Sequence, residues 1–292
     1  MLDRQPAGVA GSGAMGIEEL LEAAEGALED GRPEDALAAA RKAQKRAPLD
    51  PDAVFLEAEA LLELGEYAEA AGRYQRADAL LPDTPTILAG WGIALFERAE
   101  LERAAELLRR AAALEGREPL PEVHHYLGLL LEREGRDGEA ERHFVRARRL
   151  APDSYPPPAR VPTAELERLA AEAIDELAGL LGVEELGPWH RAALENLVPR
   201  VLPFPALEDL RAADPPHSPQ LLGLFRGVAL PQQSELGSAP ALPAFIELYQ
   251  RNLERACRDR EELREQARIT VFHEVGHQLG LDEDDLARRG LA

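Results

Sequence analysis

Apolar and polar residues alternate with the period of an α-helix along residues 17–153, and the same pattern recurs four times. Alanine marks the recurrence at Ala36, Ala70, Ala104 and Ala140, so successive repeats are 34, 34 and 36 residues apart. Each repeat holds two amphipathic segments separated by a turn. Two helices cannot bury their apolar faces alone and must stack on neighbouring pairs. The pattern therefore predicts an α-solenoid of four helix pairs over residues 17–153.

When the four repeats are aligned, three further sets of equivalent positions, or columns, indicate how the two helices of each repeat meet. Small residues lie in the first helix, larger ones are expected opposite them in the second, and a small residue marks the turn. The columns are Ala24, Ala58, Gly92 and Gly128; Ala40, Tyr74, Leu108 and Phe144; and Gly31, Gly65, Ala99 and Gly135. This period and these columns resemble the tetratricopeptide repeat. The alternative is an alanine-rich helical bundle without a true repeat.

The resemblance implies a protein-binding array whose first helices line a concave groove. Carried over from the family pattern, the residues of this partner groove include Phe55, Glu59, Glu63, Ile93, Phe96, Glu97, His125 and Leu129. Such a groove is apolar with an acidic fringe, so we expect its partner to be a basic or apolar segment of a protein or peptide. The alternative is that the glutamates are present only because glutamate favours helices.

The pattern changes after residue 153. Residues 154–162 are rich in proline and predict an extended linker. A helix then begins near Thr163, and three short apolar runs bounded by Pro and Gly predict strands: "RVLPFPAL", "QLLGLFRGV" and "PAFIELYQ". A last helix covers "DREELREQARITVFHEVGHQL", with Asp259 as its cap. Residues 163–292 are therefore expected to form a small α+β domain.

Composition and charge narrow the function. With 54 acidic and 33 basic residues the net charge is −21, which argues against nucleic acid or an anionic membrane as partner. Cys257 is the only cysteine, so neither an internal disulfide nor a thiolate zinc cluster is expected. Residues 1–16 are small and polar, lack the apolar run of a signal peptide and are expected to be disordered. We expect a cytoplasmic protein.

The candidate chemistry lies near the C-terminal end of the sequence. His273 and His277 are four residues apart, which on a helix is about 400°, so both imidazoles leave the same face about one turn apart. That spacing suits two ligands of a tetrahedral zinc ion. Glu274 is rotated by about 100° from His273 and is expected to act as the general base that takes a proton from the attacking water.

A catalytic zinc ion needs a third protein ligand and an open position. Gly280 follows His277 by three residues and is expected to end the helix, so that the acidic residues after it fold back towards the metal. The spelling His-Glu-x-x-His-x-x-Gly-x-x-Glu favours Glu283 as the third ligand, with Asp282 and Asp284 as alternatives. A bare His-Glu-x-x-His also occurs by chance in polar helices.

From about Ala164 onwards the sequence resembles the minimal zincin metallopeptidases of bacteria. The Leu-Leu-Gly-Leu block, the Asp-Arg-Glu-Glu-Leu helix start and the His-Glu-x-x-His block occur in the family's order. The resemblance implies one zinc ion and a peptidase-like domain. It departs from the family where Phe225 and Arg226 follow Leu-Leu-Gly-Leu in place of the usual tyrosine. We expect an extended substrate beside an edge strand formed by "FIELY".

Together these features predict a zinc metallopeptidase whose repeats select a partner or substrate. Two alternatives stay open. The chain can be a non-catalytic adaptor with a structural or vestigial zinc site, or a repeat scaffold that binds no metal.

Overall fold

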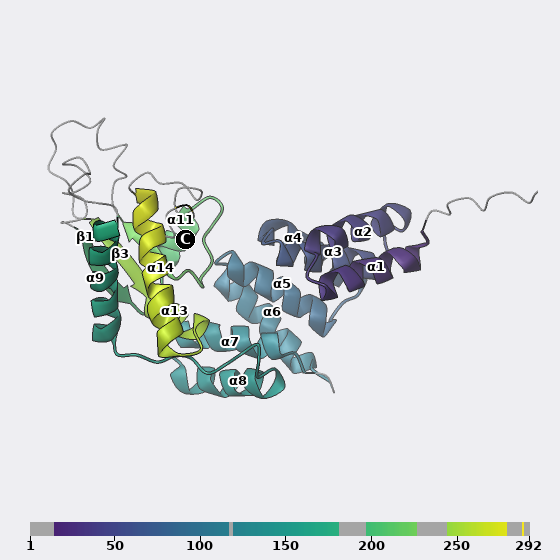
Figure 1. The fold of residues 1–292 in the computed structure, drawn as a ribbon. Helices are drawn as coiled ribbons and strands as arrows, with labels where there is room; N and C mark the ends of the chain where they lie inside the picture. The colour runs from purple at the N-terminus through teal and green to yellow at the C-terminus, as the bar shows by residue number, and fades with distance from the viewer. Residues whose placement is uncertain (1–14, 117–118, 181–196, 227–243, 279–287, 289–292) are drawn as a thin grey trace, which may run out of the picture. The chain divides into compact units, whose positions relative to one another are not determined.

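The structure is a computed structural model that describes residues 15–116, 119–180, 197–226, 244–278 and 288 (Figure 1). Each of the three runs predicted as strands overlaps an observed strand, but the first, "RVLPFPAL", is strand only as far as Leu202, and Leu207 begins a helix instead. The predicted helices are present within these ranges. Gly280 lies outside them, as do the predicted third ligand Glu283 and its alternatives Asp282 and Asp284. Among the described helices, none is both long and apolar enough to cross a membrane.

Eight helices form the four predicted pairs. They are α1 (Ile17–Glu29), α2 (Pro33–Arg46), α3 (Pro51–Glu63), α4 (Tyr67–Leu80), α5 (Pro85–Glu97), α6 (Leu101–Leu114), α7 (Pro121–Arg133) and α8 (Asp137–Leu150). Proline occupies the first turn of four of them, where its missing N–H costs no hydrogen bond. This arrangement confirms the paired-helix solenoid.

The turn inside each pair has the same backbone conformation. Gly31, Gly65, Ala99 and Gly135 all have a positive φ, between 57° and 76°. Three of the four are glycine, the residue that adopts this left-handed conformation without a steric cost. The turn column predicted from the sequence is therefore one structural position repeated four times.

The helices of a pair approach closely where small and large residues meet. A Cβ atom at Gly128 would lie 2.5 Å from a ring carbon of Phe144, and one at Gly92 would lie 2.7 Å from Leu108. Tyr74 fills the space beside Gly90 of the following repeat in the same way. The small-residue column therefore exists because large side chains of the second helices occupy the volume of the missing Cβ atoms.

Contacts divide the chain into two compact units. The first comprises Met1–Leu95 and Glu102–Glu118, and the second comprises Phe96–Leu101 and Pro119–Ala292. The last helix pair, α7 and α8, therefore belongs to the same unit as the α+β region. The end of the repeats at residue 153 and the start of the α+β domain at residue 163 were placed from the sequence pattern, and these two boundaries stay predictions.

The second unit contains a sheet of three strands in the order β1-β3-β2. The strands are β1 (Leu197–Leu202), β2 (Gly223–Arg226) and β3 (Ala244–Tyr249). β1 runs parallel to β3, and β2 runs antiparallel to it. β3, which contains "FIELY", is thus the central strand of the described sheet, and the expectation that it forms an edge was wrong. Both of its sides are paired because the two preceding strands flank it, and strand propensity alone does not encode that order.

The other helices described in this unit are α9 (Thr163–Leu180), α11 (Leu207–Ala212), α13 (Gln250–Ala256) and α14 (Arg260–Gln278). α9 and α14 pack side by side, α9 against β1 and α14 against β2 and β3 (Figure 1). Their buried residues join Ile246 and Leu248 of β3 in one core. Ala159 and Val161 of the proline-rich linker are part of this core, so the linker is extended but packed.

Enlarging Gly128 tests the close approach of α7 and α8. We expect Gly128→Ala to lower the free energy of unfolding by about 1–3 kcal/mol, because the new methyl group overlaps the Phe144 ring. Gly138→Ala in α8, where a Cβ meets nothing within 4 Å, is the control. It should be neutral or slightly stabilising. Urea denaturation measures both, and equal effects would contradict this packing.

Candidate functional site

The two predicted histidine ligands lie on α14. Asp259 caps this helix through Oδ1, which accepts hydrogen bonds from the backbone N–H groups of Glu261 and Glu262, both at 2.9 Å. Val271, Phe272 and Val275 are buried in the core and fix which face of the helix points inward. The rings of His273 and His277 are 4.5 Å apart between centroids, His273 half-buried and His277 exposed.

The carboxylate of Glu274 is held by the sheet. Its Oε2 accepts a hydrogen bond of 3.1 Å from the backbone N–H of Phe225 in β2. Burial raises the pKa of this carboxyl, while the Phe225 hydrogen bond and the charges of His273, His277 and His217 act in the opposite direction. A raised pKa makes Glu274 a stronger base, and the backbone hydrogen bond fixes its orientation.

A glycine allows α14 to reach β2. A Cβ atom at Gly223 would lie 2.6 Å from the methyl group of Thr270 and 3.0 Å from the carbonyl oxygen of Glu247. Any larger residue would push α14 away from the strand. Gly223 of the Leu-Leu-Gly-Leu block thus sets the distance at which Phe225 meets Glu274.

The donor set suits zinc as far as the structure describes it. Two imidazoles on one accessible helix face, with a carboxylate next to them, are the nitrogen ligands and the base that catalytic zinc sites use. Within the described ranges no group of three His, Cys, Asp or Glu residues could hold a metal ion. The predicted third ligand, Glu283, and the alternatives Asp282 and Asp284 lie outside these ranges, so the complete ligand set stays a prediction.

Sequence reasoning missed His217 near Glu274 but singled out Arg226 after the Leu-Leu-Gly-Leu block. His217, which pattern alone assigns to a loop, is exposed and near enough for its charge to act on Glu274. Arg226 is held by Asp209 and by Glu247, the latter at 2.8 Å. The sequence signal for His217 is its position in the proline-rich stretch "PPHSP", which predicts a stiff loop.

The partner-groove residues of the first unit remain at least partly accessible. Phe55 and Ile93 are half-buried and Glu63 is exposed. Glu59 accepts a hydrogen bond from the hydroxyl of Tyr74, whose ring lies edge-on to Phe55 at 6.3 Å. The groove role of these residues stays a prediction.

The partner-groove residues of the second unit are engaged by the chain itself. Phe96 is 1% exposed and packs edge-on against Tyr126, and Leu129 is also buried. Glu97 is 5% exposed and hydrogen-bonded within its unit. His125 stacks on Tyr155 at 4.6 Å, and burial together with the charge of Arg255 lowers its pKa to about 4. In this arrangement these positions present little surface to a partner.

Comparisons with known families match both the repeats and the region that carries the histidines. Residues 194–291 match the family described as "Zincin-like metallopeptidase", and residues 21–85 and 121–154 each match a "Tetratricopeptide repeat" family. The chain thus carries tetratricopeptide repeats in its N-terminal half and a zincin-like metallopeptidase domain after them. Both resemblances inferred from the sequence are confirmed.

Individual relatives match part of this chain. The photosystem I assembly protein Ycf3 of Synechococcus elongatus is 34% identical over 106 residues, which cover 31% of this chain and 61% of that protein. The Ycf3 of a second Synechococcus strain gives the same values. The chain therefore spans less than two thirds of the length of these curated relatives.

Solved structures of repeat proteins show a weaker likeness. A thermophilic tetratricopeptide-repeat protein of Thermus thermophilus is 23% identical, with a TM-score of 0.41, and the match covers 47% of this chain and 75% of that one. MamA of Desulfovibrio magneticus is 22% identical, also with a TM-score of 0.41, over 46% of this chain and 75% of that one. These TM-scores are low, and no conclusion rests on them.

Proposed function

We propose that the chain is a zinc-dependent peptidase whose repeats bind a protein or peptide. The observation that carries the proposal is the hydrogen bond from the Phe225 N–H to the carboxylate of Glu274, one residue after His273 on α14. It fixes the expected base beside the two expected metal ligands. The match of residues 194–291 to a metallopeptidase family supports the same reading.

His273, His277 and an acidic residue after Gly280, for which Glu283 is our choice, would hold the zinc ion. Zinc bound there supplies Lewis acidity towards the peptide carbonyl and towards water. Glu274 takes a proton from the attacking water as the oxygen bonds to the carbonyl carbon. The C–N bond then breaks, and Glu274 returns the proton to the leaving amine nitrogen. Since the Phe225 N–H leaves the other carboxylate oxygen of Glu274 for this transfer, the base needs no reorientation.

The sheet also favours β2 as the strand beside which a peptide would lie. In the described order β1-β3-β2, β2 is an edge, and it is the strand that contacts Glu274. An extended peptide paired with β2 would lie along the edge of the sheet at which Phe225 meets Glu274. β2 therefore takes the role that the sequence analysis expected of β3, because β1 and β2 already pair with both sides of β3.

Glu274→Gln should abolish cleavage while leaving zinc binding intact. We expect the rate on a zinc-loaded chain to fall by at least about 100-fold, because the amide cannot accept the proton. The assay is the appearance of new peptide termini by mass spectrometry from a peptide library. Glu261→Gln, an exposed acid on the same helix, is the control and should cleave normally. If neither the wild type nor the control cleaves any peptide, the adaptor function replaces this proposal.

The first two repeats are the proposed partner surface. Phe55 is partly accessible, and the acidic Glu63 is exposed about two turns further along the same helix, which suits an apolar or basic segment. We expect Glu63→Lys to weaken binding of a basic peptide, selected from an arrayed library, by about fivefold at low salt. Glu34→Lys, an equal charge change on the exposed face of α2, is the control. Fluorescence anisotropy measures both affinities, and equal losses would show that only net charge matters.

A further inference from the structure

The segment from His217 to Leu222 is fastened to the repeats by one buried carboxylate. Glu97, the last residue of α5, accepts hydrogen bonds at Oε2 from the hydroxyl of Ser218, at 2.5 Å, and at Oε1 from the side-chain amide of Gln220, at 2.7 Å. The Tyr126 hydroxyl of α7 donates a third bond, at 3.0 Å, to Oε1. Ser218 Oγ also accepts from the backbone N–H of Gln220, at 3.0 Å, which closes the turn.

Burying the carboxylate of Glu97 at this position is unfavourable in free energy. Burial raises the pKa of Glu97, and the three groups that donate to it are neutral, so no cation among them offsets the loss of water around it. Burial of a leucine side chain of similar size would cost less free energy. Unlike leucine, the carboxylate provides two polar atoms that hold Ser218, Gln220 and Tyr126 in fixed directions.

The far side of the same segment is fastened to α13. The side-chain amide of Asn252 donates to the carbonyl oxygens of Pro219, at 2.8 Å, and Leu221, at 2.7 Å. The backbone N–H of Tyr249 donates to the carbonyl oxygen of Leu222, at 2.9 Å, immediately before β2 begins at Gly223. A segment held at both sides transmits its position directly to the start of β2.

β2 in turn holds the base. Phe225 lies two residues after Gly223 and donates its N–H to Glu274, and His217 at the start of the segment lies close enough for its charge to reach the same carboxylate. α5 and α7 are therefore connected to Glu274 by hydrogen bonds to residues 217–222, by the backbone of β2 and by the hydrogen bond of Phe225. No step of this connection passes through the histidines of the metal site.

We propose that Glu97 is a positioning residue of the catalytic site: from the third repeat it docks residues 217–222 and so fixes β2 against Glu274. The end of α5 then helps to orient Glu274. Glu97, for which the repeat pattern predicts a place in the partner groove, binds residues of its own chain instead. The docking itself is independent of the proposed peptidase function; only its consequence for cleavage rests on that function.

Hydrogen–deuterium exchange of the full chain tests the docking without a substrate. In Glu97→Ala we expect peptides that cover residues 217–226 to exchange at least about tenfold faster, because local opening no longer breaks these hydrogen bonds. Glu97→Gln should exchange as the wild type, since its amide can still accept from Tyr126 and Gln220 and donate to Ser218. Glu141→Ala, which removes an exposed acid of α8, is the control and should change nothing there.

The double variant Ser218→Ala plus Gln220→Ala removes the two groups of the segment that donate to Glu97. It tests the docking if Glu97→Ala does not fold. Faster exchange confined to residues 217–226 supports the proposal. Unchanged exchange there, or an increase spread evenly over α7, α9 and α14, would overturn it. On an active zinc-loaded chain, both disruptive variants should lower kcat and leave zinc content unchanged. If no peptide is cleaved, the exchange result still stands on its own.

Discussion

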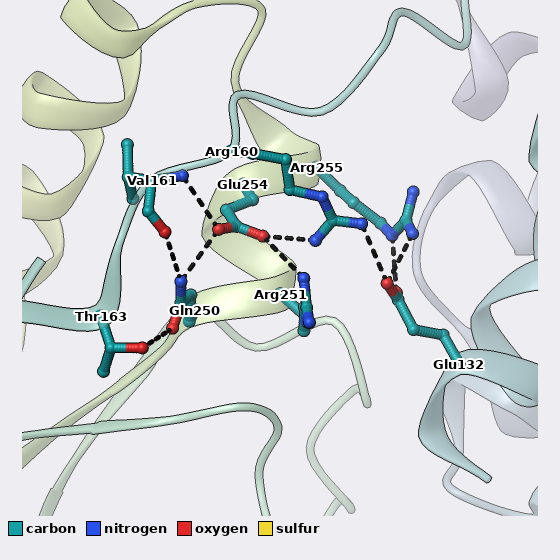
Figure 2. A network of polar contacts seen from close by, with 8 residues as sticks. All are labelled: Glu132, Arg160, Val161, Thr163, Gln250, Arg251, Glu254 and Arg255. Atoms are coloured by element: carbon teal, nitrogen blue, oxygen red, sulfur yellow. Dashed lines mark hydrogen bonds and ion pairs between the residues drawn. The ribbon is translucent and has the colours of Figure 1, made fainter. Parts of the chain in front are cut away.

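The second unit depends on the buried carboxylate of Glu254. It is 1% exposed and accepts hydrogen bonds from the backbone N–H of Val161, the side-chain amide of Gln250 and the guanidinium groups of Arg160 and Arg251 (Figure 2). A buried carboxylate without these partners would cost several kcal/mol, so the linker and α13 must lie together for the unit to fold. α13 connects the central strand to α14, and the constraint on Glu254 is therefore also a constraint on the helix that carries the site.

The same network ties the last repeat to the sheet region. Arg160 reaches from Glu254 to Glu132 of α7, at 3.1 Å, and Arg255 of α13 donates to Glu132 at 2.8 Å (Figure 2). The guanidinium of Arg255 also lies over the ring of Phe144. Burial raises the pKa of Glu132, but the hydrogen bonds and charges of Arg255 and Arg160 outweigh it and leave the pKa below its usual value. The fourth helix pair thus serves two purposes: it continues the repeat pattern, and it forms one wall of the unit that holds the candidate site. The last repeat, the linker and the sheet region are therefore packed together within one unit.

Much of this fold could be predicted from the sequence because its signals are local. The repeat period, the turn positions such as Gly65 and the cap at Asp259 depend on residues within a few turns of one another. The face shared by His273 and His277 follows from helix geometry alone. The order of the strands depends on pairs that are distant in sequence, such as Leu197 with Ala244. The burial of the proline-rich linker and the hydrogen bonds of Glu97 join residues roughly a hundred positions apart. A groove position was predicted for Glu97 from the family pattern, and the pattern could not reveal that Ser218 and Gln220 of the same chain bind there.

The proposed function requires that α14 holds a zinc ion with the help of an acidic residue beyond Gly280. The decisive measurement is zinc per chain, by elemental mass spectrometry, on the wild type, His273→Ala and Glu283→Ala. We expect about one zinc ion in the wild type and its loss in both variants. Zinc lost only in His273→Ala would move the third ligand to Asp282 or Asp284. If the wild type holds no zinc, even after reloading, the chain is not a zinc peptidase, and partner binding by the repeats is left as its function.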